Sequence, residues 1–241
     1  MKDVDSLYNS IVRSLELAGR ESRYHSDADE PDPRYKSYGV RADGRKAIIR
    51  THRKAIRGLQ RHEQLELARK LIESEYGEQQ KIALFILEPH AGYFSLDKFD
   101  QIDRLVRYLH GWSSIDSYTG TLLRDVLFRY PDECLELVHR WNQDEDLWLR
   151  RASVVLFTRK VAKSGQFNDV ALGFCENLIY DQEILVQKGV GWSLKNLMRS
   201  DKERILDYVI DLRARGVSSV ITLYAIKDIK GDERAEILGR T

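Results

Sequence analysis

Residues 63–75 read EQLELARKLIESE, and residues 78–88 read EQQKIALFILE. In both stretches the apolar residues recur at spacings of three and four, which is the period of one face of an α-helix. The break between them contains Gly77, a residue that commonly follows a helix end. Two amphipathic helices joined by so short a link predict a helical hairpin. The apolar positions are Leu65, Leu67, Ala68, Leu71, Ile72, Ile82, Leu84, Phe85 and Leu87.

The same pattern continues along the rest of the chain. Residues 5–18 predict a first helix, and the polar, acidic residues 19–35, with Pro31 and Pro33, predict a loop or mobile connection. No run alternates with period two for long enough to predict a sheet. The sequence therefore predicts an all-α fold, an α-solenoid of roughly five HEAT-like helix pairs. Further helices are expected at 42–58, 98–110, 114–129, 131–142, 146–162, 168–180, 182–199, 201–214 and 218–229.

Length and composition are those of one soluble helical domain. The 241 residues can bury a sizeable core. We expect a single domain, with a variable N-terminal helix and acidic loop at 1–37 and a repeat body at 38–241. Cys134 and Cys175 lie in different predicted helices without metal-binding spacing, so we expect two reduced core residues. No apolar run approaches the ~20 residues that cross a bilayer, and the N-terminus does not have the pattern of a signal peptide. We therefore expect a cytoplasmic protein.

One strip of the sequence is strongly basic although the net charge is only +1. Residues 41–61 hold eight Lys or Arg and a single acid, Asp43. In the predicted helix 42–58 these cations lie opposite Ile48, Ile49 and Ile56. A charged helix face is commonly just a solvated one, but such a face normally mixes signs. The strip is our candidate for binding phosphates: Arg41, Arg45, Lys46, Arg50, Arg53, Lys54 and Arg57, with Arg61 at its end.

Three short stretches carry candidate functional residues: WSSID at 112–116, LWLRRA at 147–152 and VQKGVGW at 186–192. Asp116 follows Trp112 by four residues and so shares its helix face. A further 35 residues lead to Arg151 and 41 more to Trp192, about one helical hairpin each. Such positions recur on the same face of neighbouring repeats. We therefore expect two indoles, a carboxylate and a guanidinium on one concave surface, suited to a ligand with a flat body, a phosphate and a developing positive charge.

Each motif also has a purely structural interpretation. For any one motif considered by itself, the structural interpretation is favoured. Trp112 could pack in the core with Asp116 placed near a helix start by the helix dipole. Ser113, Ser114 and Ser117 around the indole argue against this. Gly189 and Gly191 each cost up to ~1 kcal/mol within a helix, which predicts close approach by a neighbour or a ligand. The structural alternative is a tight helix–helix contact anchored by Trp192. Trp141 and Trp148 are expected in the core.

Taken in this order and spacing, the three motifs resemble those of the AlkD-like DNA alkylation repair enzymes, DNA glycosylases built from HEAT-like repeats. The resemblance extends from about Tyr38 to about Ile229. It implies that Asp116 is the catalytic carboxylate and that Arg151 holds a phosphate beside the lesion and helps to place water. It also implies that Trp112 and Trp192 flank the damaged nucleotide, which stays in the duplex. Arg150, Lys188 and Lys195 are candidates for further phosphate contacts.

The chain departs from the family pattern in three respects, one of which is that the last helix pair, 217–229, has fewer basic residues than strong DNA binding leads us to expect. The family often has two adjacent tryptophans where this chain has Gly111 and Trp112. The N-terminal lead-in also differs around residues 34–38, which leaves the roles of Tyr35 and Tyr38 open. These differences bear on affinity and lesion range more than on the reaction class.

The chemistry explains why one carboxylate is enough. Alkylation of a purine at N3 or N7 makes the base cationic, so it departs as a neutral molecule without a general acid. A carboxylate then stabilises the oxocarbenium-like sugar and orients the attacking water. The sequence predicts a monofunctional glycosylase for N3- or N7-alkylated purines in double-stranded DNA, with a concave basic DNA-binding face. We expect no metal, no cofactor, no membrane association and no obligate protein partner, and a monomer in a bacterial cytosol, associated with the nucleoid.

Two alternatives remain open from the sequence. A non-catalytic relative could bind unusual or branched DNA through the same face, although Asp116 argues against it. A HEAT-type scaffold could bind proteins, and this predicts an exposed apolar groove instead of a basic one. Binding to DNA weakens steeply with salt because phosphate contacts release counterions, so salt dependence separates the scaffold from the other two.

Overall fold

The periodic segments form helices throughout the computed structural model, which describes residues 3–22 and 32–239. Within these residues the only β-type pairing is an isolated bridge between Lys36 and Tyr76. The all-helical architecture agrees with the predicted α-solenoid class. The chain divides into two units, residues 1–126 and 127–241, and the boundary falls inside a helix. We describe each unit by itself, and the single-domain prediction stays a prediction.

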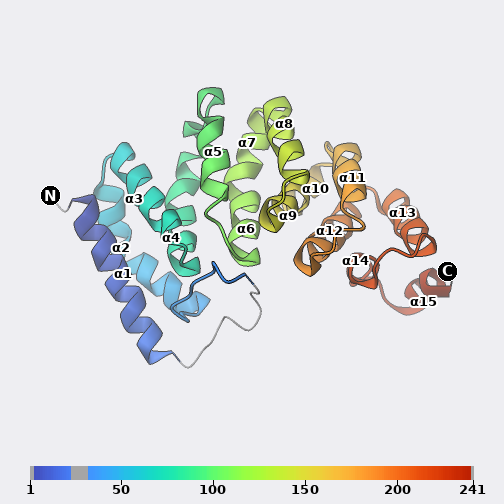
Figure 1. The fold of residues 1–241 in the computed structure, drawn as a ribbon, viewed down its shortest axis with the longest axis horizontal. Coiled ribbons are helices and arrows are strands. Elements are labelled where there is room, and N and C mark those ends of the chain that lie inside the picture. The colour runs from blue at the N-terminus through green and yellow to red at the C-terminus, as the bar shows by residue number, and fades with distance from the viewer. Residues whose placement is uncertain (1–2, 23–31, 240–241) are drawn as a thin grey trace. The chain divides into compact units, whose positions relative to one another are not determined.

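The described residues of unit 1 contain helices α1 to α6 and the first turn of α7 (Figure 1). The helix predicted at 42–58 has these bounds in the structure, and the first helix is slightly longer than predicted. The loop predicted for 19–35 lies partly outside the described residues. The elements are α1 (Val4–Glu21), α2 (Ala42–Gly58), α3 (Arg61–Glu73), α4 (Gly77–Leu87), η2 (Glu88–Tyr93), η3 (Leu96–Lys98), α5 (Phe99–Val106), α6 (Trp112–Tyr118), the π-helical η4 (Thr119–Leu123) and α7 (Arg124–Arg129).

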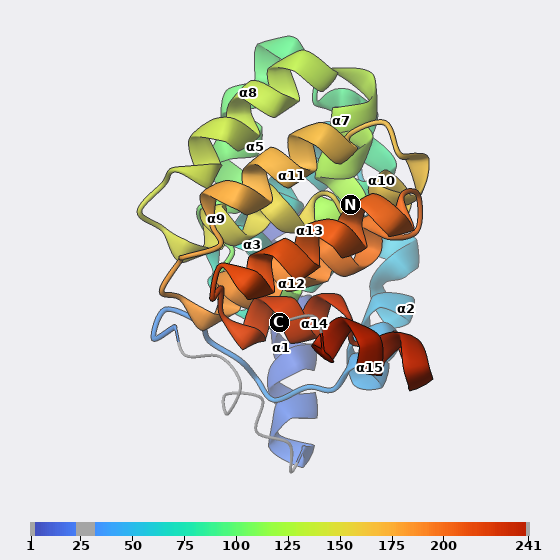
Figure 2. The same ribbon diagram turned by 90° about the vertical axis from the view of Figure 1, so that its right-hand side faces the viewer.

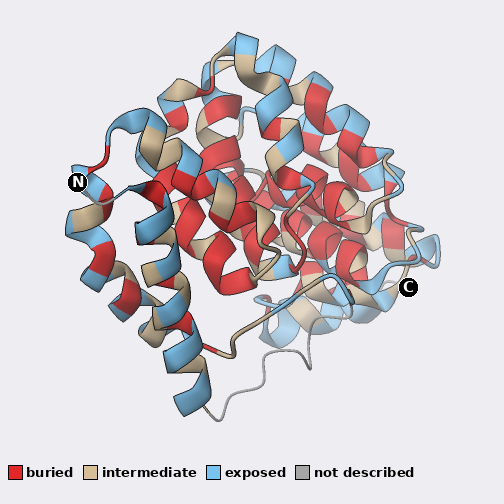
Figure 3. Cartoon of the chain, turned by 60° about the vertical axis from the view of Figure 1, so that its left-hand side comes forward, coloured by how far each residue is buried: buried red, intermediate tan, exposed pale blue. Residues whose placement is uncertain are grey.

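The core of unit 1 forms where these helices meet along their apolar sides. Helix α1 packs on α2 and α3, α3 on α4, and α4 on α6. Leu7, Ile11 and Leu15 of α1 are fully buried, and the Ser14 Oγ lies 3.0 Å from Nε2 of the buried His52 on α2. Figure 3 shows buried residues along one side of these helices and exposed residues along the other. The amphipathic pattern thus sets which side of each helix faces the core.

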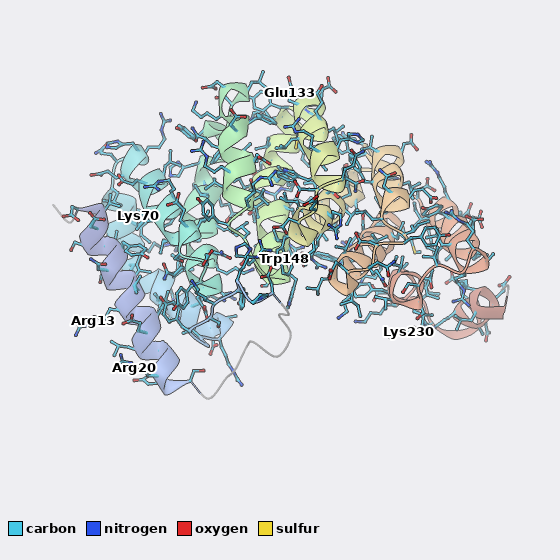
Figure 4. All side chains as sticks on the ribbon, in the orientation of Figure 1. Arg13, Arg20, Lys70, Glu133, Trp148 and Lys230 are labelled. Carbon is cyan, nitrogen blue, oxygen red and sulfur yellow. The ribbon has the colours of Figure 1, made fainter. Side chains whose placement is uncertain are left out.

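Unit 2 is arranged around α12, which contacts α9, α10, α11, α13 and α14. Figure 2 shows α13 and α14 beside it. Trp141 and Trp148 are buried as predicted, and Trp148 lies inside the unit whereas Glu133 reaches the surface (Figure 4). The elements are α8 (Pro131–Asn142), α9 (Leu147–Val155), α10 (Arg159–Ser164), α11 (Asn168–Asn177), α12 (Ile184–Leu197), α13 (Lys202–Ala214), α14 (Ser219–Ala225) and α15 (Gly231–Gly239).

The main differences from the prediction in unit 2 are one helix break and one additional helix. The single helix expected at 146–162 breaks after Val155, and α10 starts only at Arg159. The extended backbone of Thr158 (φ −114°, ψ 175°) ends the helical run, although the apolar spacing continues through it. Helix α15 was not predicted, because only Ile237 in it is buried. The cysteines agree with expectation: both are buried without a disulfide, and burial raises the pKa of each thiol to about 12.

The glycines of α12 are explained by neighbouring helices. A Cβ at Gly191 would lie 2.7 Å from the main-chain oxygen of Ile221 and 2.8 Å from the Tyr224 Cβ, both on α14. The close approach that the sequence predicted therefore comes from the protein itself. Because α14 approaches through its backbone, it cannot make room by a rotamer change.

We predict that Gly191→Ala destabilises the protein by about 1–3 kcal/mol, since α14 must move to avoid the new methyl group. Gly173→Ala in α11 is the matched control, because nothing lies within 4 Å of a Cβ there. This control should gain about 0.5–1 kcal/mol from the lower entropy of the unfolded chain. Urea unfolding measures both changes. Equal effects at the two positions would contradict the contact with α14.

Candidate active site

In unit 1 a short helix presents the first two candidate residues. Helix α6 starts after Gly111, whose φ of 106° is accessible to glycine and strained for other residues. The Gly111 oxygen accepts from the main-chain N–H groups of Ser114 and Ile115, which begins the helix. This backbone explains the glycine where the related family often has a second tryptophan. One turn of α6 then carries Trp112, which is 41% exposed, and Asp116, which is 8% exposed.

A lysine from a neighbouring helix holds this turn. The Lys81 Nζ on α4 donates to the main-chain oxygen of Ser113 and, at 2.7 Å, to the Ser117 Oγ. Ser117 also donates to the Ser113 oxygen at 2.9 Å. Two of the serines that the sequence marked as unusual therefore bind Lys81, and the third, Ser114, is buried. Sequence reasoning missed Lys81, because only the packing of α4 on α6 brings the ammonium to these oxygens.

The helix widens three residues after Asp116. Residues Thr119–Leu123 form a π-helical turn, in which the Thr119 Oγ1 donates to the Ile115 oxygen at 3.0 Å. The chain then continues as α7. Such turns are rare and occur frequently at functional sites. Here the turn changes the phase of the side chains between α6 and α7, so α7 does not continue the face that carries Trp112 and Asp116.

The basic strip and α6 are linked through one face of α4. Arg53 on α2 stacks over the ring of Phe85, with its Cζ 5.5 Å from the ring centroid. Phe85 follows Lys81 by one helical turn, so both lie on the same side of α4. Within unit 1, Arg53 of α2 and the turn with Trp112 and Asp116 therefore contact adjacent turns of the same helix, α4. The concave basic face itself stays a prediction.

Most cations of the strip are exposed, as predicted. Ile48 and Ile56 point into the core, and Ile49 is half-buried. Arg45 is the exception among the cations, since it is half-buried and burial lowers its pKa. Among the described residues, no ion pair involves four of the strip's cations, namely Lys46, Arg50, Lys54 and Arg57.

The segment before α2 is held by a buried carboxylate. Glu78, at the start of α4, accepts hydrogen bonds from the main-chain N–H groups of Tyr38 (3.1 Å) and Val40 (3.0 Å) and from the Ser37 hydroxyl (2.9 Å). The Tyr38 ring stacks on Tyr76 at 4.3 Å between centroids, and burial raises the pKa of its hydroxyl to about 12. In unit 1 Tyr38 thus ties this segment to α4.

Unit 2 brings Arg151 and Trp192 onto two packed helices, α9 and α12. Arg151 is 5% exposed, and its Nη1 donates at 2.5 Å to the main-chain oxygen of Leu185 in the first turn of α12. A Cβ at Gly189 would lie 3.3 Å from the Arg151 Cγ, so this glycine leaves room for the arginine stem. Trp192 is half-buried, so part of its side chain is accessible although neighbouring helices cover much of it.

The remaining candidates in unit 2 differ in their partners. Arg150 forms an ion pair with Asp181 (2.6 Å) and donates to the main-chain oxygens of Asp144 and Glu145. Lys195 lies 3.1 Å from Asp228, and Lys188 is exposed. A phosphate would have to share Arg150 and Lys195 with these carboxylates, so their role in DNA binding stays a prediction. The convergence of Trp112 and Asp116 from unit 1 with Arg151 and Trp192 from unit 2 also stays a prediction.

Two negative findings concern the described residues alone. No helix among them is long and apolar enough to cross a membrane. In the same ranges, 3–22 and 32–239, no group of three or more His, Cys, Asp or Glu side chains could hold a metal ion.

The fold and these residues define a helical-repeat protein with a carboxylate, an arginine and two partly exposed indoles. The family model for DNA alkylation repair enzymes matches residues 12–229, so the chain belongs to that family. Membership points to a role in DNA alkylation repair, with DNA as the substrate. A predicted DNA alkylation repair enzyme from Enterococcus faecalis shares the fold, with a TM-score of 0.68 and 14% identity over 91% of this chain and 95% of that chain. A comparison with curated proteins finds no match.

We predict that Lys81→Met destabilises the protein by about 1–2 kcal/mol, because two oxygen acceptors on α6 lose a charged donor. Lys70→Met is the matched control, since Lys70 forms an ion pair with the exposed Asp5 on the surface. That substitution should cost less than about 1 kcal/mol. Urea unfolding provides the measurement. If the two variants were equally stable, Lys81 would not be holding α6.

Proposed function

We propose that the protein is a monofunctional DNA glycosylase that releases N3- or N7-alkylated purines from duplex DNA without a metal. The observation that carries the proposal is Asp116, a largely buried carboxylate one helical turn after the exposed indole of Trp112. A carboxylate shielded from water in this way stabilises a nearby developing positive charge more strongly than one in bulk solvent. Membership of the alkylation repair family supports the same reaction class.

The proposed reaction needs little from the protein beyond charge and position. The alkyl group has already made the base cationic, so the C1′–N bond breaks with both electrons going to the base. Asp116 stabilises the oxocarbenium-like sugar, water adds to C1′, and one proton is released. The products are the neutral base and an abasic site. No Lewis acid is required, because the leaving group is activated by the lesion itself.

The other candidates have complementary roles in this proposal. Trp112 offers an electron-rich π face, which attracts the cationic lesion or its sugar. Arg151, whose Nη1 donates to the Leu185 main-chain oxygen, holds a phosphate beside the lesion. The exposed cations of α2 follow the phosphate backbone, which fixes the duplex without reading its sequence.

We predict that Asp116→Asn lowers the rate of 7-methylguanine release from duplex DNA by about 10²–10³-fold or more. Affinity for the duplex should stay within a few-fold of wild type, because the substitution removes charge and little volume. Single-turnover base release and fluorescence anisotropy measure the two quantities.

Asp125→Asn is the matched control for this experiment. Asp125 lies on α7, where it forms a surface ion pair with Arg124 at 2.7 Å. The control should release the base at nearly the wild-type rate. If folded wild-type protein binds the duplex but releases no base above the spontaneous rate, the non-catalytic DNA-binding alternative replaces the glycosylase.

We predict that the double variant Arg50→Gln, Lys54→Gln reduces the slope of log K against log salt by about 1.8, since each lost phosphate contact contributes about 0.9. Its control is Arg69→Gln, Arg107→Gln, because these exposed arginines form ion pairs with Glu73 and Asp103. The control should keep the wild-type slope. An unchanged slope in the α2 variant would remove this helix from the DNA-binding surface.

One observation favours the scaffold as a second candidate. A mostly apolar cavity of about 300 Å³ opens between α3, α4 and α5, with Leu65, Leu87 and Leu105 in its walls. Arg69, Glu66 and Arg104 also line it. A protein-binding scaffold would use such a surface, and its affinity for a partner would change little with salt. Weak, salt-independent binding to DNA by the wild-type protein would favour this alternative.

A further inference from the structure

Arg159, at the start of α10, has an unusual backbone. Its φ is 52°, in the left-handed region that residues with a Cβ rarely adopt. Such strain persists where surrounding contacts hold it, and it is found disproportionately at functional sites. The contact here is specific: the Arg159 N–H donates to the Asn196 Oδ1 at 3.1 Å.

The residue that holds Arg159 also binds the turn with Trp192. Asn196 lies on α12, is 2% exposed, and donates from its Nδ2 to the Trp192 main-chain oxygen at 2.9 Å. A buried amide thus ties the strained residue of α10 to the helix turn that carries the candidate indole. Since both hydrogen bonds are made to backbone groups, they fix where the chain of Arg159 runs relative to Trp192.

This arrangement places the arginine side chain on the indole. The Arg159 Cζ lies 5.3 Å from the centroid of the Trp192 ring, within the range of a cation–π contact. A guanidinium that stacks on an aromatic ring still directs its N–H groups outward from its edge. Stacking therefore orders the side chain without using its hydrogen-bond donors.

Arg159 has no acidic partner among the described residues, whereas several other cations of unit 2 have one. Arg150, Arg204 and Arg215 all form ion pairs, with Asp181, Asp169 and Glu176 respectively. Arg159 is exposed and takes part in none, and the same holds for its neighbours Lys160 and Lys163 on α10. A cation that is ordered and exposed without a counter-ion is suited to bind an external anion.

We propose that Arg159 is a phosphate-binding residue for duplex DNA and that Trp192 is the platform that orders it. The proposal rests on the proposed function only for its ligand, a DNA phosphate. It gives Trp192 a second role besides contact with the lesion, because the indole face under Arg159 is covered by the guanidinium. No pattern in the sequence pointed to Arg159, because its pairing with Trp192 depends on the break between α9 and α10.

The test measures binding of a lesion-free duplex by fluorescence anisotropy over a range of salt concentrations. Arg159→Gln should reduce the slope of log K against log salt by about 0.9 and weaken binding at about 0.1 M salt by on the order of tenfold. The loss should be equal for duplexes with and without 7-methylguanine. Arg159→Lys should keep the slope but bind less tightly than wild type, since it lacks the planar fork that stacks and binds phosphate.

Arg204→Gln is the matched control, because it removes a cation of the same unit that already has a carboxylate partner at 2.7 Å. Its slope should equal that of wild type. The platform role is tested by a double-mutant cycle with Trp192→Leu, in which the loss from Arg159→Gln should become smaller when the indole is absent.

The outcomes separate this inference from the proposed function. A wild-type slope in Arg159→Gln, with circular dichroism that shows a folded protein, overturns the phosphate contact. If the losses of affinity from Arg159→Gln and Trp192→Leu are additive, Trp192 does not order Arg159, but the phosphate contact of Arg159 stands. If the wild-type protein binds and releases alkylated base normally in either case, the glycosylase proposal stands without Arg159. If the wild-type protein bound no DNA, both the phosphate contact of Arg159 and the glycosylase proposal would be overturned.

Discussion

Unit 2 depends on the close approach of α12 to helices α9 and α14. At Gly191 the backbone of α14 occupies the space of a Cβ, and at Gly189 the stem of Arg151 fills it. These two glycines lie two residues apart in one helix, so they face different neighbours. Because α12 can come this near, the Arg151 guanidinium reaches the Leu185 oxygen and Trp192 stays close to α10. The close helix contacts of α12 and the positions of Arg151 and Trp192 therefore depend on the same two glycines.

Two charged side chains of α4, Glu78 and Lys81, have the equivalent role in unit 1. They are one turn apart on this helix, and both bind main-chain groups of neighbouring segments. The Glu78 carboxylate accepts from backbone N–H groups of the segment before α2, whereas the Lys81 ammonium donates to oxygens of α6. Hydrogen bonds of charged groups are stronger than neutral ones when they are shielded from water. Helix α4 thereby positions both the start of the basic helix and the turn with Asp116.

The partners of each cation distinguish structural from binding roles better than its position in the sequence does. Arg150 and Arg151 are adjacent, yet Arg150 forms an ion pair with Asp181 whereas Arg151 donates to the main-chain oxygen of Leu185 on α12. On α2 several cations have no acidic partner among the described residues, and on α10 Arg159 is in the same state. Such surfaces lower the cost of binding a polyanion, because no internal ion pair must be broken first.

The sequence by itself determined the helical class, most helix positions and the burial of Trp141 and Trp148, because these follow from apolar periodicity within a single segment. It also identified WSSID, LWLRRA and VQKGVGW as the places to look. It could not decide why Gly189 and Gly191 are glycines, whether Trp192 is buried, or which helix reaches the serines around Trp112. Those answers depend on side chains far apart in the chain, such as Lys81 with Ser117 and Arg159 with Trp192. Periodicity records which side of a helix is apolar, and only tertiary packing selects the neighbour that covers it.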